Sequence, residues 1–180
     1  MANLILEMPR KWQIYDRVRG VALSSDRFQF IFKFEQDLEE ILSRGVHTYN
    51  EWTMVIDRWV ENPPPDYLQY LPVWVQIRNI PVNYRTTKTI MTFGEFAGQV
   101  TEVAFDPMKA QTKDYVRVKI LFDVSKPVRR TKVINLPKNG GSVTLRYDFE
   151  RIQKRCFRCQ RLTHQQESCP IFRQARLEKA

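Results

Sequence analysis

The sequence predicts an α+β protein that ends in a small module rich in cysteine. Strand-like runs with alternating apolar and polar residues recur along the first 150 residues, and short segments with helical spacing separate some of them. Three consecutive prolines at residues 63–65 divide this pattern into two parts. All three cysteines of the chain lie within residues 156–169. We therefore expect two mixed units followed by a compact module.

Residues 1–62 are expected to form the first unit. A short helix is predicted at Asn3–Met8, where Pro9 should end it. The runs Arg17–Leu23 and Phe28–Phe34 are joined by a Ser-Ser-Asp turn, which predicts a hairpin.

The first unit is expected to continue with a helix and a strand. Glu35–Leu42 has acidic residues early and apolar residues at helical spacing, and Gly45 follows as a cap. Trp52–Trp59 is typical of a strand, and residues 63–72 are expected to be a proline-rich linker.

Residues 73–152 predict a second unit in which the pattern starts again. A helix is expected at Thr86–Gly98, and strands at residues 73–81, 100–105, 115–122, 132–136 and 143–149. The last two strands flank Pro-Lys-Asn-Gly-Gly, a strong hairpin turn. This order matches the ferredoxin-like layout of RNA-recognition modules, a four-stranded antiparallel sheet with helices on one side. The first unit is expected to share this layout without its opening strand.

The module at residues 153–172 has the spacing of a metal site. Cys156, Cys159, His164 and Cys169 supply three thiolates and one imidazole, which satisfy tetrahedral Zn²⁺ with no open position. We therefore expect one structural zinc ion and no hydrolysis at the metal. Three cysteines fit poorly with a disulfide framework. A Cys-x-x-Cys redox pair usually opens a helix after a strand, and the arginine-rich flanks and following histidine of this pair do not suggest that context. Unrelated free thiols are a further alternative.

Positive charge is concentrated around this module. Residues 151–180 hold eight basic and two acidic residues, which accounts for six of the nine net positive charges. A local field of this kind favours polyanionic partners. The alternative is that this region, with its basic tail at residues 173–180, is solvated and only aids solubility.

The cysteine spacing resembles the CCHC zinc knuckle of retroviral nucleocapsid and many RNA-binding proteins, and Phe157 matches the aromatic residue after the first cysteine. The resemblance implies binding of single-stranded RNA or DNA, with a base stacked near Phe157. Gln160 and Thr163 stand where those knuckles usually have glycine, which eases tight turns. The basic residues that could contact phosphates beside the aromatic ring are Arg155, Arg158 and Arg161.

One face of the second sheet offers further candidates. Alternation along residues 73–81 and 115–122 should place polar side chains on the face opposite the helices. The candidate nucleic-acid contacts on that face are Arg78, Arg117 and Lys119. Such a face could hold a phosphate backbone but would distinguish bases poorly. The alternative is that this face packs against the first sixty residues.

The order of longer segments carries a second resemblance. FQFIFKFEQDLEEIL, a Trp-rich strand ending in DRW, PVWVQIRNIPVNYRT, a basic strand and then the knuckle resemble a plant-specific domain of unknown function. That domain is abundant in proteins of LINE-type retroelements and their domesticated relatives, and it commonly precedes a CCHC knuckle. The resemblance implies a retroelement-derived plant protein that binds nucleic acid. Such domains usually begin with a further strand, so we expect a chain shortened at its N-terminus.

The favoured function is therefore zinc-dependent binding of single-stranded nucleic acid, and the alternative is a protein-interaction adaptor with a purely structural knuckle. No nucleophile motif, phosphate-cradling glycine loop or acidic catalytic cluster is present, so an enzyme is not expected. No run of about 18 apolar residues predicts a membrane span. We expect an intracellular protein. We expect the nucleus rather than the cytoplasm. The basic cluster at residues 126–132 is interpreted as a phosphate contact or as part of a nuclear import signal, and a solvated connection is equally open.

Overall fold

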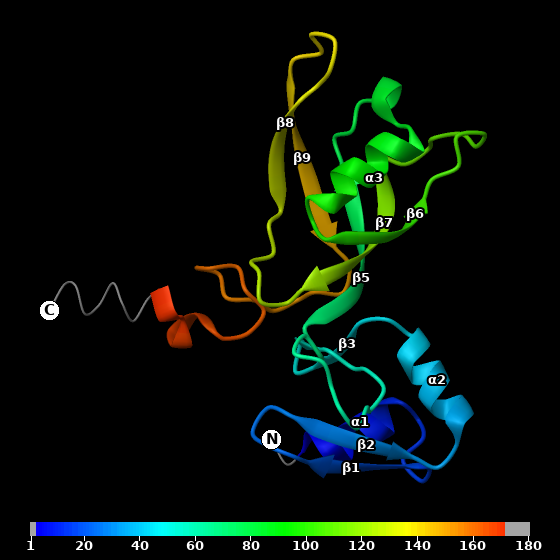
Figure 1. Cartoon of the computed structure of the whole chain (residues 1–180), viewed down its shortest axis with the longest axis vertical. Helices are drawn as coiled ribbons and strands as arrows, with labels where there is room; N and C mark the ends of the chain where they lie inside the picture. Colours follow the sequence, from blue (N-terminus) through cyan, green and yellow to red (C-terminus); the bar gives the residue numbers. More distant parts are fainter. Residues whose placement is uncertain (1–2, 172–180) are drawn as a thin grey trace, which may run out of the picture.

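The computed structural model describes residues 3–171 and shows two α+β units joined near the start of the C-terminal module (Figure 1). The first unit lies below the larger sheet in this view, and the chain that follows the last strand emerges between them. The strands of both units pair antiparallel, which confirms the α+β prediction at this level. The predicted basic tail at residues 173–180 lies outside the described residues.

The first unit begins with a helix and a hairpin. Helix α1 (Leu4–Lys11) continues through Pro9, whereas the sequence predicted that Pro9 would end it. Pro9 lacks an N–H donor, but it is buried and its carbonyl still accepts from Ile14 N at 3.1 Å. The next strands, β1 (Val18–Ala22) and β2 (Phe28–Phe32), form the predicted hairpin.

The rest of the first unit differs more from the prediction. Helix α2 (Glu35–Ser43) forms as expected, with Gly45 at φ +81° just beyond its end. The following hairpin pairs β3 (His47–Tyr49) with β4 (Trp52–Met54). The two residues of its turn, Asn50 and Glu51, both have positive φ, as a tight two-residue turn requires. The predicted strand at residues 52–59 is therefore wrong beyond residue 54.

The first unit has two separate two-stranded sheets, one formed by β1 and β2 and the other by β3 and β4. It is therefore not the second unit's single sheet with one strand missing. Its core is built mainly around α1 and Trp12, whose indole contacts the rings of Phe30 and Phe32 at centroid distances of 4.9 and 6.0 Å. Trp59, at the end of the predicted strand segment, is 64% exposed.

The second unit is one antiparallel sheet of five strands, which correspond to the five predicted strand segments, whereas the ferredoxin-like layout has four. The strands are β5 (Tyr70–Arg78), β6 (Gln99–Ala104), β7 (Tyr115–Asp123), β8 (Thr131–Asn135) and β9 (Ser142–Phe149). Their spatial order is β6-β7-β5-β9-β8. The chain between β7 and β9 forms the edge strand β8 where a ferredoxin-like layout has its second helix. β5 begins at Tyr70, inside the segment expected to be a linker.

Helix α3 (Thr87–Glu95) packs on one face of this sheet. Thr86 caps it, because its hydroxyl accepts from the backbone N–H of Thr89 at 3.2 Å. Two short 3₁₀ turns complete the elements, at Val82–Tyr84 and Gln166–Ser168. None of the helices within residues 3–171 is long and apolar enough to cross a membrane.

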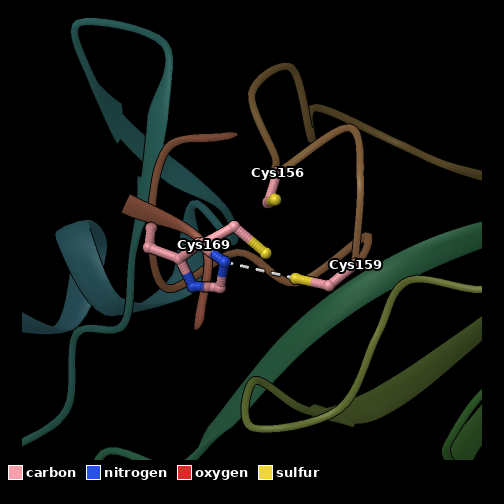
Figure 2. A group of neighbouring side chains, drawn as sticks. Cys156, Cys159 and Cys169 are labelled. Carbon is pink, nitrogen blue, oxygen red and sulfur yellow. Dashed lines mark hydrogen bonds between the residues drawn. The ribbon is translucent and has the colours of Figure 1, made fainter. Parts of the chain in front are cut away.

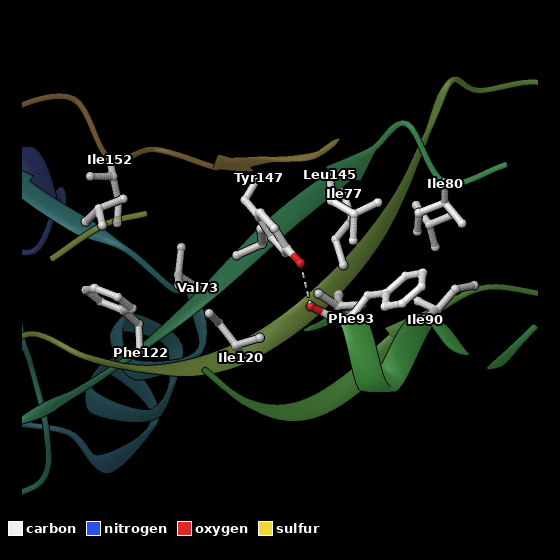
Figure 3. Close-up of a cluster of buried hydrophobic side chains, with 14 of the residues drawn as sticks. Val73, Ile77, Ile80, Ile90, Phe93, Ile120, Phe122, Leu145, Tyr147 and Ile152 are labelled. Atoms are coloured by element: carbon white, nitrogen blue, oxygen red, sulfur yellow. Dashed lines mark hydrogen bonds between the residues drawn. The ribbon is translucent and has the colours of Figure 1, made fainter. Parts of the chain in front are cut away.

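Alternation along the central strands produces the larger core, as predicted. Val75, Ile77, Val118 and Ile120 are fully buried beneath α3. Figure 3 shows Tyr147 reaching across this cluster, where its hydroxyl donates to the carbonyl of Phe93 at 2.8 Å. That bond satisfies a polar group that would otherwise be costly to bury.

The two units meet through the chain that follows β9. Lys154 N–H donates to the carbonyl of Glu51 at 3.3 Å, and the Lys154 ammonium lies 3.0 Å from the Glu51 carboxylate. Val46 and Val55 of the first unit pack against the larger core. The first unit is thereby connected to the segment that leads into the cysteine module.

Candidate metal centre

The structure brings the four predicted ligands together in the loop that follows β9. The ligand atoms of Cys156, Cys159, His164 and Cys169 all lie within 4.8 Å of one another. Cys156 and Cys169 are fully buried. Figure 2 shows the three labelled cysteine thiols directed toward a common centre. Sequence spacing alone therefore located the cluster.

A tight turn presents the first two thiols. Gln160 N–H donates to the carbonyl of Cys156 at 2.8 Å, and Cys156 N–H donates to the carbonyl of Arg161 at 2.9 Å. Gln160 has φ +62°, a left-handed conformation that favours glycine. Its amide donates to the carbonyl of Phe157 at 2.8 Å. The turn therefore forms at this non-glycine position, with a side-chain hydrogen bond to support it.

Thr163 orients the imidazole ligand. His164 Nδ1 lies 3.0 Å from the Thr163 hydroxyl, and Nε2 lies 3.2 Å from Cys159 Sγ. A hydrogen bond at one ring nitrogen directs the other toward the thiols, which is the usual arrangement around a metal-bound histidine. Thr163, which replaces the glycine of similar knuckles, thus has a positioning role.

The electrostatics of the cluster also suit a metal ion. Burial by itself would raise the pKa of Cys156, but hydrogen bonds, including those from the backbone N–H groups of Cys159 and Arg158, lower it to about 6. Burial raises the pKa of Cys159, and the neighbouring thiols Cys156 and Cys169 add to that effect. Such a group of thiols favours a cation that takes the charge of several thiolates.

The distances between the ligand atoms also suit a bound zinc ion. Zn–S bonds of about 2.3 Å at tetrahedral angles place the sulfurs about 3.8 Å apart, which the cluster's limit of 4.8 Å allows. The residues present therefore fit a four-coordinate metal with no open position.

The module is docked on the larger sheet. Val128 N–H donates to the carbonyl of Gln160 at 2.9 Å. Ile152 belongs to the larger core, and Leu162 packs against it. These contacts connect the residues around the cluster to the loop between β7 and β8.

The predicted nucleic-acid contacts of the module differ in exposure. The Phe157 ring is 69% exposed, and Arg158 and Arg161 are exposed as well. Arg155 is only half-exposed, and its Nε is buried without a hydrogen-bond partner. Burial and the nearby charge of Arg130 lower the pKa of Arg155. A guanidinium held beside another cation would gain from an anion between them.

The sheet-face candidates are arranged as predicted but are partly neutralised. Arg117 donates to both oxygens of Glu150, at 2.8 and 2.9 Å. Arg78 donates to Asp148 at 2.8 Å and to Asp114 at 2.6 Å.

Lys119 lies 6.0 Å from the centroid of the Trp74 ring, and no ion pair with a carboxylate occurs for it within residues 3–171. Arg78 and Arg117 are therefore paired with carboxylates, and their contact with nucleic acid stays a prediction. Sequence reasoning missed their acidic partners, because Asp148 and Glu150 reach this face through the pairing of β9 with β5, and Asp114 through the pairing of β7 with β5.

The fold and the site together define an α+β protein that carries a C-terminal CCHC zinc knuckle. Comparison with known families gives the same arrangement. Residues 1–66 match the family described as "Domain of unknown function (DUF4283)", and residues 122–171 match a zinc knuckle family. The chain thus has a DUF4283 domain followed by a zinc knuckle, which is the arrangement that the resemblance implied. The knuckle match begins at the end of β7 and includes β8 and β9.

An uncharacterized protein of Arabidopsis thaliana is similar to this chain. It is 30% identical over 134 residues, which cover 74% of this chain and 42% of the relative. The chain therefore spans about two fifths of the length of that relative. No solved structure matches the chain.

Proposed function

We propose that this protein binds single-stranded RNA or DNA through a zinc-loaded knuckle and is related to retroelement gag-like proteins. The observation that carries the proposal is the exposed ring of Phe157, directly after the buried ligand Cys156. Large apolar side chains of small modules are usually buried, whereas a base can stack on an exposed aromatic ring. The protein acts in this proposal by binding rather than by catalysis, and in the nucleus.

The charges near the ring support a strand as the ligand. Arg155 and Arg161 have no carboxylate partner within residues 3–171, and Arg155 lies beside Arg130. The phosphates of a strand can contact such cations while a base stacks on the aromatic ring. We also propose that the sheet is a variant of the ferredoxin-like layout, since β7, β5 and β9 are adjacent and α3 covers one face.

Zinc has a structural role in this proposal. Cys156, Cys159, His164 and Cys169 hold one ion, and the closed set of ligands leaves no position for a substrate. The ion fixes the turn that carries Phe157, and the protein supplies the groups that contact the strand.

Fluorescence anisotropy with a labelled single-stranded oligonucleotide across a salt series tests the proposal. Phe157→Ala should weaken binding by about 1–3 kcal/mol, the usual range for a stacked base. Phe34→Ala is the matched control, because Phe34 is 48% exposed in the first unit. Equal effects of the two variants, or no binding at low salt by zinc-loaded protein, would favour the adaptor function instead.

A further inference from the structure

A second basic site lies where the first unit meets the chain that leads into the knuckle. A cleft of about 340 Å³ opens there, and its lining includes Lys11, Arg44, His47 and Arg151. Lys11 ends α1, Arg44 caps α2, and Arg151 follows β9. Three cations from three separate elements therefore converge on one cleft.

The charge of this cleft is not compensated locally. The Lys11 ammonium donates to the carbonyl of Thr48 at 2.7 Å, and Arg151 donates to the carbonyl of Arg44 at 3.4 Å. These partners are neutral, so they hold the cations in place without cancelling their charge. Arg44 alone has a carboxylate, that of Glu40 at 2.6 Å, on an exposed surface. No acidic residue lines the cleft in the described part of the chain.

His47 lines the cleft and is surrounded by the same three cations. Its Nε2 lies 2.8 Å from the carbonyl of Ile41, and its Nδ1 lies 3.3 Å from the indole nitrogen of Trp12. Both ring nitrogens are therefore engaged, which fits a neutral imidazole. Burial lowers the pKa of His47, and every ionised group that acts on it is one of the three cations.

We propose that this cleft binds a phosphate group of the same nucleic-acid strand that the knuckle holds. This inference rests on the proposed function and adds a second contact to it. Arg151 precedes Cys156 by five residues, so at about 3.6 Å per residue the two are at most about 18 Å apart along the chain. A single strand within the usual site size of about 4–16 nucleotides can reach both.

The test uses the full zinc-loaded chain and a labelled oligonucleotide of about 12 nucleotides. Lys11→Gln and Arg151→Gln should each weaken binding several-fold at low salt and reduce the slope of log K against log salt by about 0.7. Both side chains are exposed, and thermal unfolding will verify that the variants fold. Lys138→Gln, in the turn between β8 and β9, removes the same charge far from the cleft and should change neither quantity (Figure 1).

A second measurement examines the cleft without nucleic acid. Inorganic phosphate should saturably shift the NMR signal of the Trp12 indole N–H, which donates to His47, and Arg151→Gln should remove that shift. If the wild type binds the oligonucleotide and Phe157→Ala weakens binding but the cleft variants do not, the inference is wrong and the proposed function stands. If the wild type binds no oligonucleotide, the proposed function itself fails. Phosphate binding without any effect of the cleft variants on oligonucleotide binding would also overturn the assignment to the strand.

Discussion

The guanidinium of Arg117 lies over the indole ring of Trp74, 4.4 Å from the ring centroid. The same guanidinium donates two hydrogen bonds to Glu150 of the chain that follows β9. A cation so placed is stabilised by the ring face and by the carboxylate together. The face that the sequence predicted as a phosphate contact therefore also makes an internal contact at this position.

A double-mutant cycle will measure this contact. Arg117→Gln and Glu150→Gln should show a coupling energy of about 0.5–1 kcal/mol in urea unfolding, since both side chains are partly exposed. Arg117→Gln should change oligonucleotide affinity by less than about twofold, because the charge is already paired. A large loss of affinity with unchanged stability would show that Arg117 contacts the ligand directly.

Acid should weaken the same face. Burial opposes ionisation of Glu150 and Asp148, but hydrogen bonds from Arg117 and Arg78 outweigh it, so the pKa of each carboxyl lies below its ordinary value. The folded protein therefore binds fewer protons than the unfolded chain near these values. The pairs contribute stability above about pH 4.5, and that contribution is lost as the pH falls through the folded pKa values. The urea midpoint should therefore fall as the pH is lowered from about 4.5 through the folded pKa values. In the double variant Glu150→Gln/Asp148→Asn, the midpoint should fall less over the same pH range.

Metal removal should affect the knuckle before the sheet. Elemental analysis of protein purified under reducing conditions should find one zinc ion per chain, and His164→Ala should lose it. A chelator should increase amide exchange at Cys156 and Gln160, whose hydrogen bonds form the knuckle turn, and at Val128, whose hydrogen bond connects the loop to the knuckle. Amides of the central strands β5 and β7 should stay protected, because their core contains no metal ligand. Simultaneous loss of protection everywhere would contradict this separation, and a stoichiometric disulfide without metal would contradict the zinc site.

The left-handed residue of the knuckle gives a fourth prediction. Gln160→Gly and Gln160→Ala both remove the amide that donates to Phe157, but only glycine adopts φ +62° without a steric penalty. The glycine variant should therefore be the more stable of the two by about 1 kcal/mol. Thermal unfolding of both zinc-loaded variants will show this, and equal stability would mean that the turn relaxes when the side chain is shortened.

The buried hydroxyl of Tyr147 gives a fifth prediction. Burial raises its pKa, and the hydroxyl donates to the carbonyl of Phe93. Tyr147→Phe should lower the free energy of unfolding by about 1–3 kcal/mol, because it leaves that carbonyl without its partner. Tyr15→Phe is the control, since Tyr15 is 71% exposed and the change there should be close to neutral.

Sequence patterns predicted the elements whose signals are local. The alternation of β5 and β7 and the hairpin of β8 and β9 followed from residue spacing and turn residues. The strand β3 was missed, because three residues are too few to show a period. Helix α1 was predicted to end at Pro9, but it continues to Lys11 with Pro9 buried inside it. The sequence alone did not show that Pro9 would be buried there.

In the candidate site, too, the local features were predictable from the sequence and those that depend on distant residues were not. The four metal ligands lie within fourteen residues, so their spacing alone indicated the cluster. The ion pairs of Arg78 and Arg117 depend on residues 33 to 70 positions away, so no local pattern could indicate them. The cleft of Lys11, Arg44 and Arg151 likewise exists only after three distant segments meet.

The hydrogen bond from Val128 to the carbonyl of Gln160 has a consequence for affinity. A knuckle on a free tether would lose rotational freedom each time a strand joined it to a second contact. Here that freedom is already restricted when the protein folds, so the second contact is made at a fixed separation. Such preorganisation lowers the entropy cost of binding without adding any interaction. Loosening this one backbone contact should therefore weaken binding even though neither partner residue would touch the ligand.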